Sequence, residues 1–418
     1  MQTQTRDIAG MADADAANER AASIPVRSSA ADHLRVDVFD SMAPLEAEWR
    51  ALEQDDLASL HQSYDWCAAW VESFRYPLAI LRGSIGGRVA FILPLEITRS
   101  HGIRRAEFIG ARHSNINTGL FSAEFLAGGD LTPADAIAVA AALRGKADLA
   151  ILRNVPLEWR GRRNPLASLP AVENQNHAFQ LPFLDSFEAS LKQVNAKRRR
   201  KKYKHQSRLL DARGGYEYVI AEPDQQGALL DLFFHQKAIR FKDAGLPDVF
   251  DDTATRAALH RLLRCRTGSG SDSMLQMHAL RLRGEHEGHI PAVAALSRKG
   301  GHVICQFASI DEAFVAEASP GELLFWLTIE RLHREGVAIF DFGIGDQIYK
   351  RSWCPMETVQ HDLILPISGI GRLAATAQRS ITRAKAAIKS NRKLYAFVQR
   401  LRARRGIVTA TADEGEGD

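Results

Sequence analysis

The sequence predicts an α/β (α+β) fold of two tandem units, in which mixed, mostly antiparallel sheets are flanked by helices. Three apolar runs at 274–283, 290–298 and 302–310 are separated only by short turns, which is typical of an antiparallel meander. An amphipathic helix and a short buried strand follow at 319–342. Strands also alternate with helices in the first half of the chain, so each half is expected to fold as an α/β unit.

The composition is that of a globular protein with large cores. The chain has 418 residues, of which 45% are hydrophobic and 25% charged, and its formal net charge is +4. Cys67, Cys265, Cys305 and Cys354 are scattered without a Cys-x-x-Cys pair, which fits a reduced protein better than a disulfide framework. No apolar run reaches the roughly 18–20 residues of a membrane span, and no export signal is recognisable. We therefore expect a cytoplasmic protein.

The first half is expected to form a domain at 33–183, after a disordered segment at 1–32 that is rich in Ala, Asp, Ser and Arg. One of its helices carries Trp66, Trp70 and Phe74 at positions i, i+4 and i+8, an aromatic stripe that we assign to the core. The strands and helices that follow complete one α/β unit.

The second domain is expected at 184–368 and begins with a strongly basic helix. All residues at 197–204 except Tyr203 are Lys or Arg. Two interpretations stay open for this run: a solvated helix face, or a site for an anion such as CoA phosphate, a polyphosphate lipid or RNA.

The helix after the meander has a strong start signal. Ser319 is placed to act as the N-cap, Pro320 occupies the first helical position, and Glu322 completes a Ser-x-x-Glu capping box. Gly336 ends the helix, and a buried strand is expected at 337–342. A glycine-rich turn and a cluster of polar residues come next.

Three strands, a helix with a bare N-terminus and one more strand resemble, in this order, the acyl-CoA-binding core of the GNAT acetyltransferase superfamily. In that superfamily the acyl donor lies where two neighbouring strands part, with its pyrophosphate on the helix N-terminus. Two motifs are more specific: Ser-Pro-Gly-x-Leu-Leu from residue 319, and Asp-Phe-Gly-x-Gly-Asp-x-x-Tyr-Lys-Arg from residue 341. They resemble the acetyltransferase group associated with bacterial cellulose and envelope-polysaccharide biosynthesis, which is similar in build to the FemAB peptidoglycan aminoacyltransferases.

The resemblance implies two tandem GNAT-like domains, of which the first is degenerate. The likeness in the first half covers the tryptophan-rich helix, Phe-Ile-Leu-Pro-Leu at 91–95 and Phe-Ile-Gly at 108–110, but this half has no glycine-framed helix start. Donor binding is therefore assigned to the second half, with acetyl-CoA or another acyl-CoA as co-substrate. The residues expected to bind it are Phe307, Ala308, Ser309, Ser319, Pro320, Gly321, Glu322 and Leu323.

The backbone N–H groups of Gly321, Glu322 and Leu323 are expected to hold the donor's phosphates, because a helix start has unsatisfied donors and a positive dipole end. The Glu322 carboxylate would repel a phosphate unless it turned back to cap Ser319. An ordinary, well-capped helix is the alternative for this segment.

Four residues of the second motif are candidates for catalysis. Asp341, within an apolar strand, and Asp346, in a glycine-flexed loop, are candidate general bases. Following the resemblance, Tyr349 is expected to protonate the CoA sulfur, and Lys350 to orient a carboxylate or bind an anionic acceptor. A turn cap for Asp346, and plain packing or surface exposure for Tyr349 and Lys350, stay open as alternatives.

The acceptor is expected to contact His235, Lys237 and Arg240, because this part of the chain also resembles the polysaccharide-associated group. No metal site is expected. His286 and His289 lie across a turn, and no third ligand is in sight.

The C-terminal segment at 369–418 is expected to form a basic amphipathic helix followed by an acidic disordered tail. Residues 371–405 include eleven Lys and Arg and no Asp or Glu. Such a helix fits peripheral contact with an anionic membrane, packing on the domain, or pairing with an acidic partner.

Three functions follow from this interpretation. The first is direct transfer of an acyl group from acyl-CoA to the nitrogen or oxygen of a small-molecule or glycan acceptor, such as an envelope polysaccharide precursor or a sugar-linked metabolite. The second is a FemAB-type transferase that uses aminoacyl-tRNA, with the helix at 197–204 binding the RNA. The third is a non-catalytic, GNAT-like scaffold of a polysaccharide synthase. A nucleic acid partner is expected only under the second.

Overall fold

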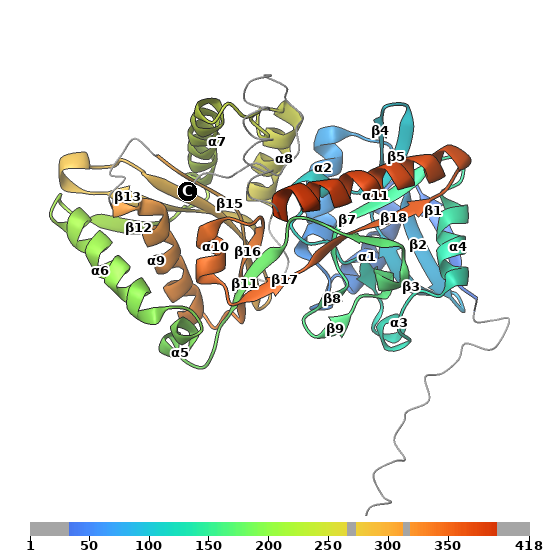
Figure 1. The fold of residues 1–418 in the computed structure, drawn as a ribbon, viewed down its shortest axis with the longest axis horizontal. Coiled ribbons are helices and arrows are strands. Elements are labelled where there is room, and N and C mark those ends of the chain that lie inside the picture. The colour runs from blue at the N-terminus through green and yellow to red at the C-terminus, as the bar shows by residue number, and fades with distance from the viewer. Residues whose placement is uncertain (1–32, 266–272, 312–317, 391–418) are drawn as a thin grey trace, which may run out of the picture.

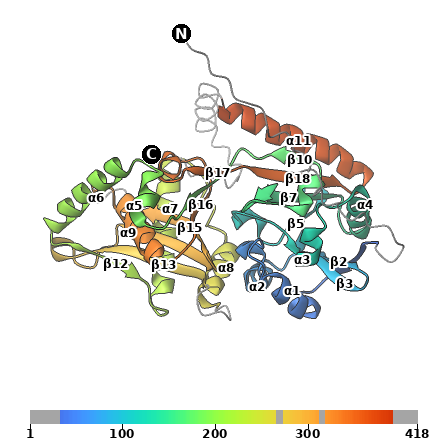
Figure 2. The same ribbon diagram turned by 90° about the horizontal axis from the view of Figure 1, so that it is seen from below.

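The computed structural model describes residues 33–265, 273–311 and 318–390. The chain folds into two α/β units that lie side by side (Figure 1, Figure 2). The expected mixed α/β fold, with mostly antiparallel sheets flanked by helices, is confirmed. The disordered segment predicted at 1–32 and the acidic tail lie outside the described residues.

The first unit holds a four-stranded and a five-stranded sheet. Its strands and helices are β1 (Arg35–Phe39), α1 (Glu46–Leu52), α2 (Tyr64–Phe74), β2 (Ile80–Ile85), β3 (Arg88–Leu93), β4 (Leu95–Ser100), β5 (Ile103–Phe108), β6 (Leu120–Phe121), α3 (Ala123–Ala127), α4 (Pro133–Ala142), β7 (Leu149–Pro156), β8 (Glu158–Trp159), β9 (Arg162–Arg163), β10 (Ala171–Glu173) and, from near the end of the chain, β18 (Gln360–Pro366). These two sheets have the orders β1-β2-β3-β6 and β10-β18-β7-β5-β4, and β8 and β9 form a separate two-stranded sheet. Strands β5 and β7 run parallel, and α4 lies in the crossover that such a pair requires.

The second unit is built on one seven-stranded sheet. Its strands and helices are β11 (Ala178–Pro182), α5 (Phe187–Lys192), α6 (Ala196–Asp211), β12 (Tyr216–Ile220), α7 (Gln226–Asp243), α8 (Thr253–Arg264), β13 (Ser273–Leu282), β14 (Ala292–Lys299), β15 (His302–Ile310), α9 (Pro320–Arg334), β16 (Ile339–Ile344), α10 (Ile348–Trp353) and β17 (Met356–Thr358). The sheet order is β12-β13-β14-β15-β16-β11-β17. The three apolar runs form the expected antiparallel meander as β13, β14 and β15, and α9 connects β15 to the parallel strand β16.

Helices cover both faces of the seven-stranded sheet. Along β14, Val293 and Ala295 belong to the hydrophobic cluster that includes α7 and α8. Ala292, Ala294 and Leu296 belong to the cluster that includes α9. Successive side chains of a strand point to opposite faces, so this alternation separates the two cores. Helix α9 therefore lies on the face opposite to α7 and α8.

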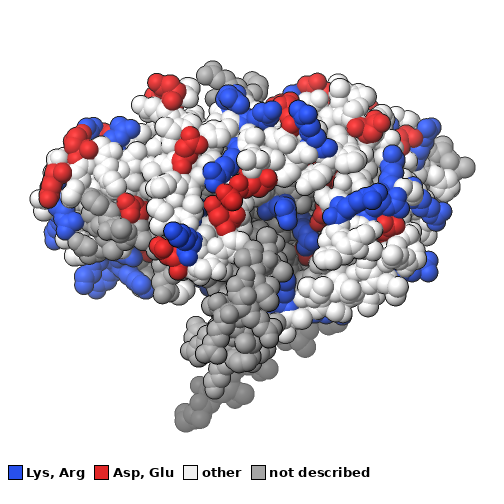
Figure 3. Space-filling model, turned by 90° about the horizontal axis from the view of Figure 1, so that it is seen from above, with Lys and Arg blue, Asp and Glu red and all other residues white. Residues whose placement is uncertain are grey.

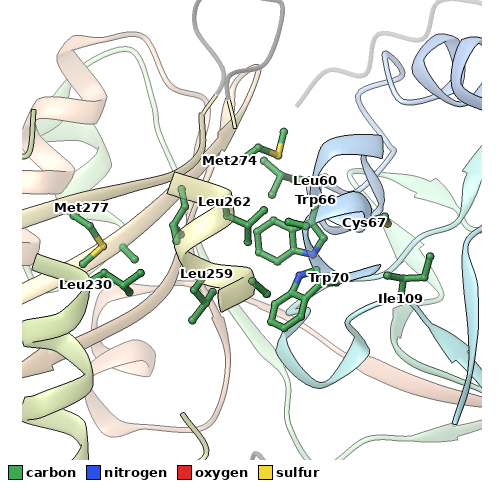
Figure 4. Packing of buried hydrophobic residues seen from close by; sticks show 14 of the residues in the cluster. Leu60, Trp66, Cys67, Trp70, Ile109, Leu230, Leu259, Leu262, Met274 and Met277 are labelled. Carbon is green, nitrogen blue, oxygen red and sulfur yellow. The ribbon is translucent and has the colours of Figure 1, made fainter. Parts of the chain in front are cut away.

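The two units share one of these cores. Trp66 and Trp70 of α2 are each 1% exposed, and they point towards Leu259 and Leu262 of α8 (Figure 4). The aromatic stripe predicted to be core is therefore confirmed, with Phe74 half-buried beside it. Because the same cluster continues into β13 and β14, side-chain packing holds the two units together.

Each unit also takes a strand from the other side of the boundary that we predicted near residue 183. Strand β11, which precedes that position, pairs with β16 and β17 in the second unit. Strand β18, which lies within the predicted second domain, pairs with β10 and β7 in the first. The chain thus crosses between the units twice, between β10 and β11 and again between β17 and β18. A strand pattern indicates a strand but not its sheet partner, because tertiary contacts choose the partner.

The helix α11 (Gly369–Ser390) is the described part of the basic C-terminal segment. It packs along the five-stranded sheet, where Ala375 joins a cluster with Ile151, Val172 and Ile364. Figure 3 shows one face of the molecule, on which basic and acidic side chains are mixed. Among the described residues, no helix is both long and apolar enough to cross a membrane.

Candidate active site

Strands β15 and β16 start side by side and then part. Their parallel pairing runs from His302 with Ile339 to Ile304 with Asp341, and both strands continue past it. Beyond this point β15 stays with β14 as far as Ile310, whereas β16 follows β11. The sheet therefore opens between β15 and β16, at the position that the resemblance assigns to an acyl donor.

A β-bulge lies in β15 where the strands part. Ala295 of β14 faces Phe307, and the next residue, Leu296, faces Cys305, so Gln306 is an extra residue in β15. A bulge takes its extra residue out of the ladder of hydrogen bonds and bends the strand. Backbone groups of β15 are thus released from sheet pairing at the opening.

A cavity of about 240 Å³ lies beside this opening, between the two units, and we call it the interunit cavity. The second unit lines it with residues of α7, the loop that follows α7, β15 and α10. The first unit adds Trp66 of α2 and the run Arg112 to Asn115. Its volume is close to the lower end of the range of small-molecule sites, and neither unit alone encloses it.

Tyr349 and Lys350 both line the interunit cavity. The ring of Tyr349 stacks on Phe325 of α9 at 5.6 Å and meets Phe342 edge-on at the same distance. Burial raises the pKa of the Tyr349 phenol well above its usual range, so the phenol stays protonated near pH 7. The Lys350 side chain is buried, and its Nζ donates to the carbonyl oxygen of Ile344 at 2.5 Å.

Asp341 is fully buried and is not among the residues that line the interunit cavity. Its carboxylate accepts hydrogen bonds from Gln180 Nε2 at 3.1 Å and from the Gly343 N–H at 2.7 Å. His302 Nε2 lies 3.2 Å from the same group. The carboxylate thereby shapes the end of β16, where Gly343 has a φ of 69°. This geometry favours a positioning role for Asp341, and its use as a general base stays a prediction.

The Asp346 side chain, like that of Asp341, does not reach the interunit cavity. It forms an ion pair with Arg351, whose other guanidinium nitrogen lies 3.1 Å from Glu357. Asp346 is not among the residues that line the interunit cavity. No contact with the opening supports its predicted role as a general base. The alternative, in which Asp346 caps a turn, agrees better with its position.

The start of α9 differs from the predicted capping box. Ser319 has the left-handed backbone angles φ 44° and ψ 62°, and its side chain makes no capping hydrogen bond. Its carbonyl oxygen accepts instead from the N–H groups of Glu322 and Leu323, at 3.0 and 3.3 Å. Of the three N–H groups predicted to hold phosphates, only that of Gly321 donates to no atom in the described part of the chain.

The Glu322 carboxylate does not turn back to Ser319, because two cations of α6 hold it. It lies 3.2 Å from Arg199 Nη1 and 2.9 Å from Lys202 Nζ. The Arg199 side chain is 8% exposed and covers the ring of Trp353. The basic helix therefore neutralises Glu322 beside the helix start, which removes the repulsion expected between that carboxylate and a phosphate.

The remaining donor residues lie along β15. Phe307 and Ala308 line the interunit cavity, whereas the Ser309 hydroxyl donates to Gln236 of α7 at 2.6 Å. Gly321 lies near the end of the same strand, since a Cβ at this glycine would come within 2.8 Å of Ile310. The predicted donor residues thus surround the opening from both faces of the sheet.

The predicted acceptor residues divide along α7. Lys237 and Arg240 line the interunit cavity, whereas His235 is exposed outside it. Residues three apart on a helix share a face, and a residue two positions earlier points to another side. Sequence spacing groups these three residues, but only Lys237 and Arg240 reach the cavity.

Asn115 of the first unit is a site residue that sequence reasoning missed. Its Oδ1 accepts from the Ile344 N–H at 3.1 Å, and its Nδ2 donates to Gln306 at 2.9 Å, so it bridges the two parted strands. His61 adds a second contact to Gln306, at 3.0 Å. A Cβ at Gly343 would lie 2.5 Å from Asn115, which explains the glycine. A polar Asn-Ile-Asn run beside Gly110 was the available signal.

Residues 197–351 match the family model described as the acetyltransferase (GNAT) domain. This match covers 155 of the 418 residues and lies within the second unit. The tandem fold is similar to the crystal structure of FemX, at 13% identity over 79% of this chain and 98% of that one, with a TM-score of 0.54. It is also similar to the C-terminal domain of a protein named lysylphosphatidylglycerol synthetase from Agrobacterium fabrum, at 13% identity over 83% and 96%, with a TM-score of 0.50. No curated protein matches the chain. These findings support an acyltransferase.

Six of the fifteen predicted site residues line the interunit cavity beside the opening. Those that line the interunit cavity are Lys237, Arg240, Phe307, Ala308, Tyr349 and Lys350. Gly321 lies at the end of β15 on the α9 side, while Asp341, Asp346 and His235 lie outside the cavity lining. In the described parts of the chain, no group of three or more His, Cys, Asp and Glu residues is placed to hold a metal ion.

Proposed function

We propose that the GNAT domain transfers an acyl group, acetyl in the first instance, directly from acyl-CoA to an amine or hydroxyl of an acceptor. The observation that supports this is the parting of β15 and β16 beside the start of α9, with the interunit cavity on the other face of the sheet. An acyl-CoA threaded between the strands has its phosphates on the α9 side and its thioester at the cavity.

The residues at the opening suit the chemistry of acyl transfer. The acceptor nitrogen or oxygen bonds to the thioester carbon, the C–S bond breaks, and the thiolate takes the proton of Tyr349. The acceptor loses its own proton to water, from which Tyr349 is then reprotonated. Backbone N–H groups released by the bulge in β15 stabilise the negative charge that forms on the carbonyl oxygen.

The α9 side carries the proposed phosphate contacts. No described residue accepts from the Gly321 N–H there, and Lys202 and Arg199 lie next to the helix start on α6. Helix starts favour anions through their N–H groups and their dipole, and nearby cations add to this attraction.

Calorimetry with acetyl-CoA tests the proposal. We expect micromolar binding to the full chain, and an affinity about tenfold or more lower for Gly321→Glu, since its carboxylate enters the phosphate site. Gly227→Glu is the matched control, because Gly227 also lies in the first turn of a helix, α7, and has open space around it. Absence of binding to any acyl-CoA would overturn the proposal.

A second candidate function is transfer from aminoacyl-tRNA, as in the FemAB-type enzymes. It is favoured by Lys197, Arg198, Lys201 and Lys204, all exposed on α6, and by the loss of two of the three predicted phosphate contacts at α9. Neutralising the four cations would then abolish a salt-sensitive binding of tRNA. Equal binding of tRNA by the neutralised variant would exclude this candidate.

The setting of the reaction is also a proposal. The resemblance favours an envelope polysaccharide precursor or sugar-linked metabolite as acceptor. Cys67, Cys265, Cys305 and Cys354 are all free thiols, which favours a cytoplasmic location.

We also propose that α11 rests on an anionic membrane. Ile370, Leu373 and Ile381 are 54%, 75% and 51% exposed, and the helix sequence has five Lys and Arg and no acid. So many like charges disfavour pairing with a second copy and favour anionic lipid.

Co-sedimentation with phosphatidylglycerol vesicles tests the membrane contact. Leu373→Glu with Ile381→Glu should strongly reduce pelleting, whereas Ile137→Glu, at an apolar side chain 66% exposed on α4, should not. Equal pelleting of both variants would rule the contact out.

A further inference from the structure

Basic side chains from both units meet at the interunit cavity. Lys237 and Arg240 reach it from α7, Lys350 from α10, and Arg112 from the first unit. No Asp or Glu is among the described residues that line it. His113, also in the lining, is neutral near pH 7, because burial lowers its pKa to about 4. The described lining therefore carries positive charge only.

Two of these cations act on Cys305 of β15, and a third acts on Tyr349 of α10. Burial raises the pKa of the Cys305 thiol to about 12, and the charges of Lys350 and Lys237 oppose that rise. Burial likewise raises the pKa of Tyr349, and the charge of Arg240 opposes it. Lys237, Arg240 and Lys350 all line the interunit cavity together with Gln306, Phe307 and Ala308 of β15, where the strands part.

A buried hydrogen-bond donor favours the same kind of ligand. The side-chain oxygen of Gln306 lies between His61 and Asn115. Its Nε2 is buried and has no acceptor among the described residues. Leaving such an N–H unpaired is costly, so the site favours a ligand atom that accepts a hydrogen bond.

We infer that the acceptor substrate carries an oxyanion, a carboxylate or a phosphate, beside the amine or hydroxyl that receives the acyl group. Lys237 and Arg240 hold the oxyanion, and Gln306 Nε2 donates to a neighbouring oxygen. Lys and Arg both make charge-assisted hydrogen bonds to carboxylate and phosphate. This inference rests on the proposed function, and it narrows the acceptor to a small anionic compound.

Three amino sugars with one ring test the inference: glucosamine, glucosamine 6-phosphate and glucosaminuronic acid. Each is titrated by calorimetry into the full chain in the presence of CoA, which has no acyl group to transfer. We expect at least one anionic sugar to bind about tenfold or more tightly than glucosamine. Preference for the phosphate or for the uronic acid identifies which oxyanion the site takes.

The Lys237→Gln, Arg240→Gln double variant should bind the anionic sugar no better than glucosamine. Lys242→Gln, which removes an exposed charge of α7 outside the cavity lining, should behave as the unmodified chain. The inference is overturned if neither anionic sugar binds, if glucosamine binds equally well, or if the preference survives the double variant. Acetyl-CoA is titrated separately. If acetyl-CoA does not bind but the anionic sugar is still preferred, the proposed function is contradicted while the oxyanion site is supported.

Discussion

Helices α4 and α9 begin with the same sequence pattern, but only α4 forms the capping box that the pattern predicts. Both follow a Ser/Thr-Pro-x-Asp/Glu start, and both connect two parallel strands of their unit. In α4, Thr132 Oγ1 accepts from the Asp135 N–H at 3.1 Å, and Asp135 Oδ2 accepts from the Thr132 N–H at 2.9 Å. In α9, neither half of this reciprocal cap forms.

The strands beside these helices differ in the same way. In the first unit, the Asn117 N–H donates to Asn154 of β7 at 2.9 Å, and Asn154 Nδ2 donates to Ser114, so the chain's own loop lies against the strand. In the second unit, the interunit cavity lies beside the parted strands. In the first unit, the capped helix α4 accompanies a strand, β7, whose edge is covered by the chain's own loop. In the second unit, the uncapped helix α9 accompanies two parted strands with a cavity beside them. This contrast supports the proposal that the second unit binds the acyl donor.

The largest expected effect comes from removing the Tyr349 hydroxyl, because Tyr349 lines the interunit cavity beside the parted strands. Tyr349→Phe should lower turnover about 10²-fold or more, because a positioned general acid contributes that much, while the affinity for acetyl-CoA stays unchanged. Release of CoA thiol measures turnover, and calorimetry measures affinity. Tyr203→Phe, at a ring stacked on Trp326 on the α6 side, is the control and should be fully active. Full activity of Tyr349→Phe would remove this residue from the mechanism.

Asp341→Asn should act mainly on stability. The amide cannot accept from Gln180, Gly343 and His302 in the same arrangement, which leaves a buried donor unpaired and costs about 1–3 kcal/mol in the free energy of unfolding. Turnover should fall with it, because the end of β16 is then displaced. Urea unfolding gives the free energy.

Asp346→Asn is the control for this change. It breaks only a partly exposed ion pair with Arg351 and should change the free energy of unfolding by about 0–1 kcal/mol. A stable Asp341→Asn variant without turnover would contradict the positioning role and support Asp341 as the general base.

The two helix starts can be compared directly by removing their hydroxyls. Thr132→Ala should cost about 1 kcal/mol in the free energy of unfolding, the usual price of a lost N-cap. Ser319→Ala should cost much less, since its side chain makes no capping hydrogen bond. Urea unfolding of both variants measures the difference. Equal losses in the free energy of unfolding would mean that the Ser319 side chain caps α9 in solution. The uncapped helix start would then be contradicted.

Local patterns predicted much of this molecule. The meander, α9 and β16 follow from apolar periodicity and glycine positions, and the spacing of Tyr349 and Lys350 places both at the opening. What could not be predicted depends on contacts between distant segments. The cap of α9 is undone because Glu322 meets Arg199, a residue 123 positions earlier. Likewise the place of Asn115 between the parted strands depends on how two units dock, and no local pattern encodes that docking.

Glu322→Gln is expected to give the smallest effect, a change in the affinity for acetyl-CoA. It tests directly whether the ion pairs of Glu322 compete with phosphate at the start of α9. In α9 the carboxylate competes for Arg199 and Lys202, so its removal should make both cations available to the donor's phosphates. We expect acetyl-CoA to bind about fivefold more tightly, which corresponds to a charge interaction of about 1 kcal/mol near the surface. Glu330→Gln, two turns along the same helix, is the control and should bind as the unmodified chain. Unchanged affinity in Glu322→Gln would mean that the phosphates lie elsewhere, and weaker affinity would mean that Glu322 supports the site by holding α6 in place.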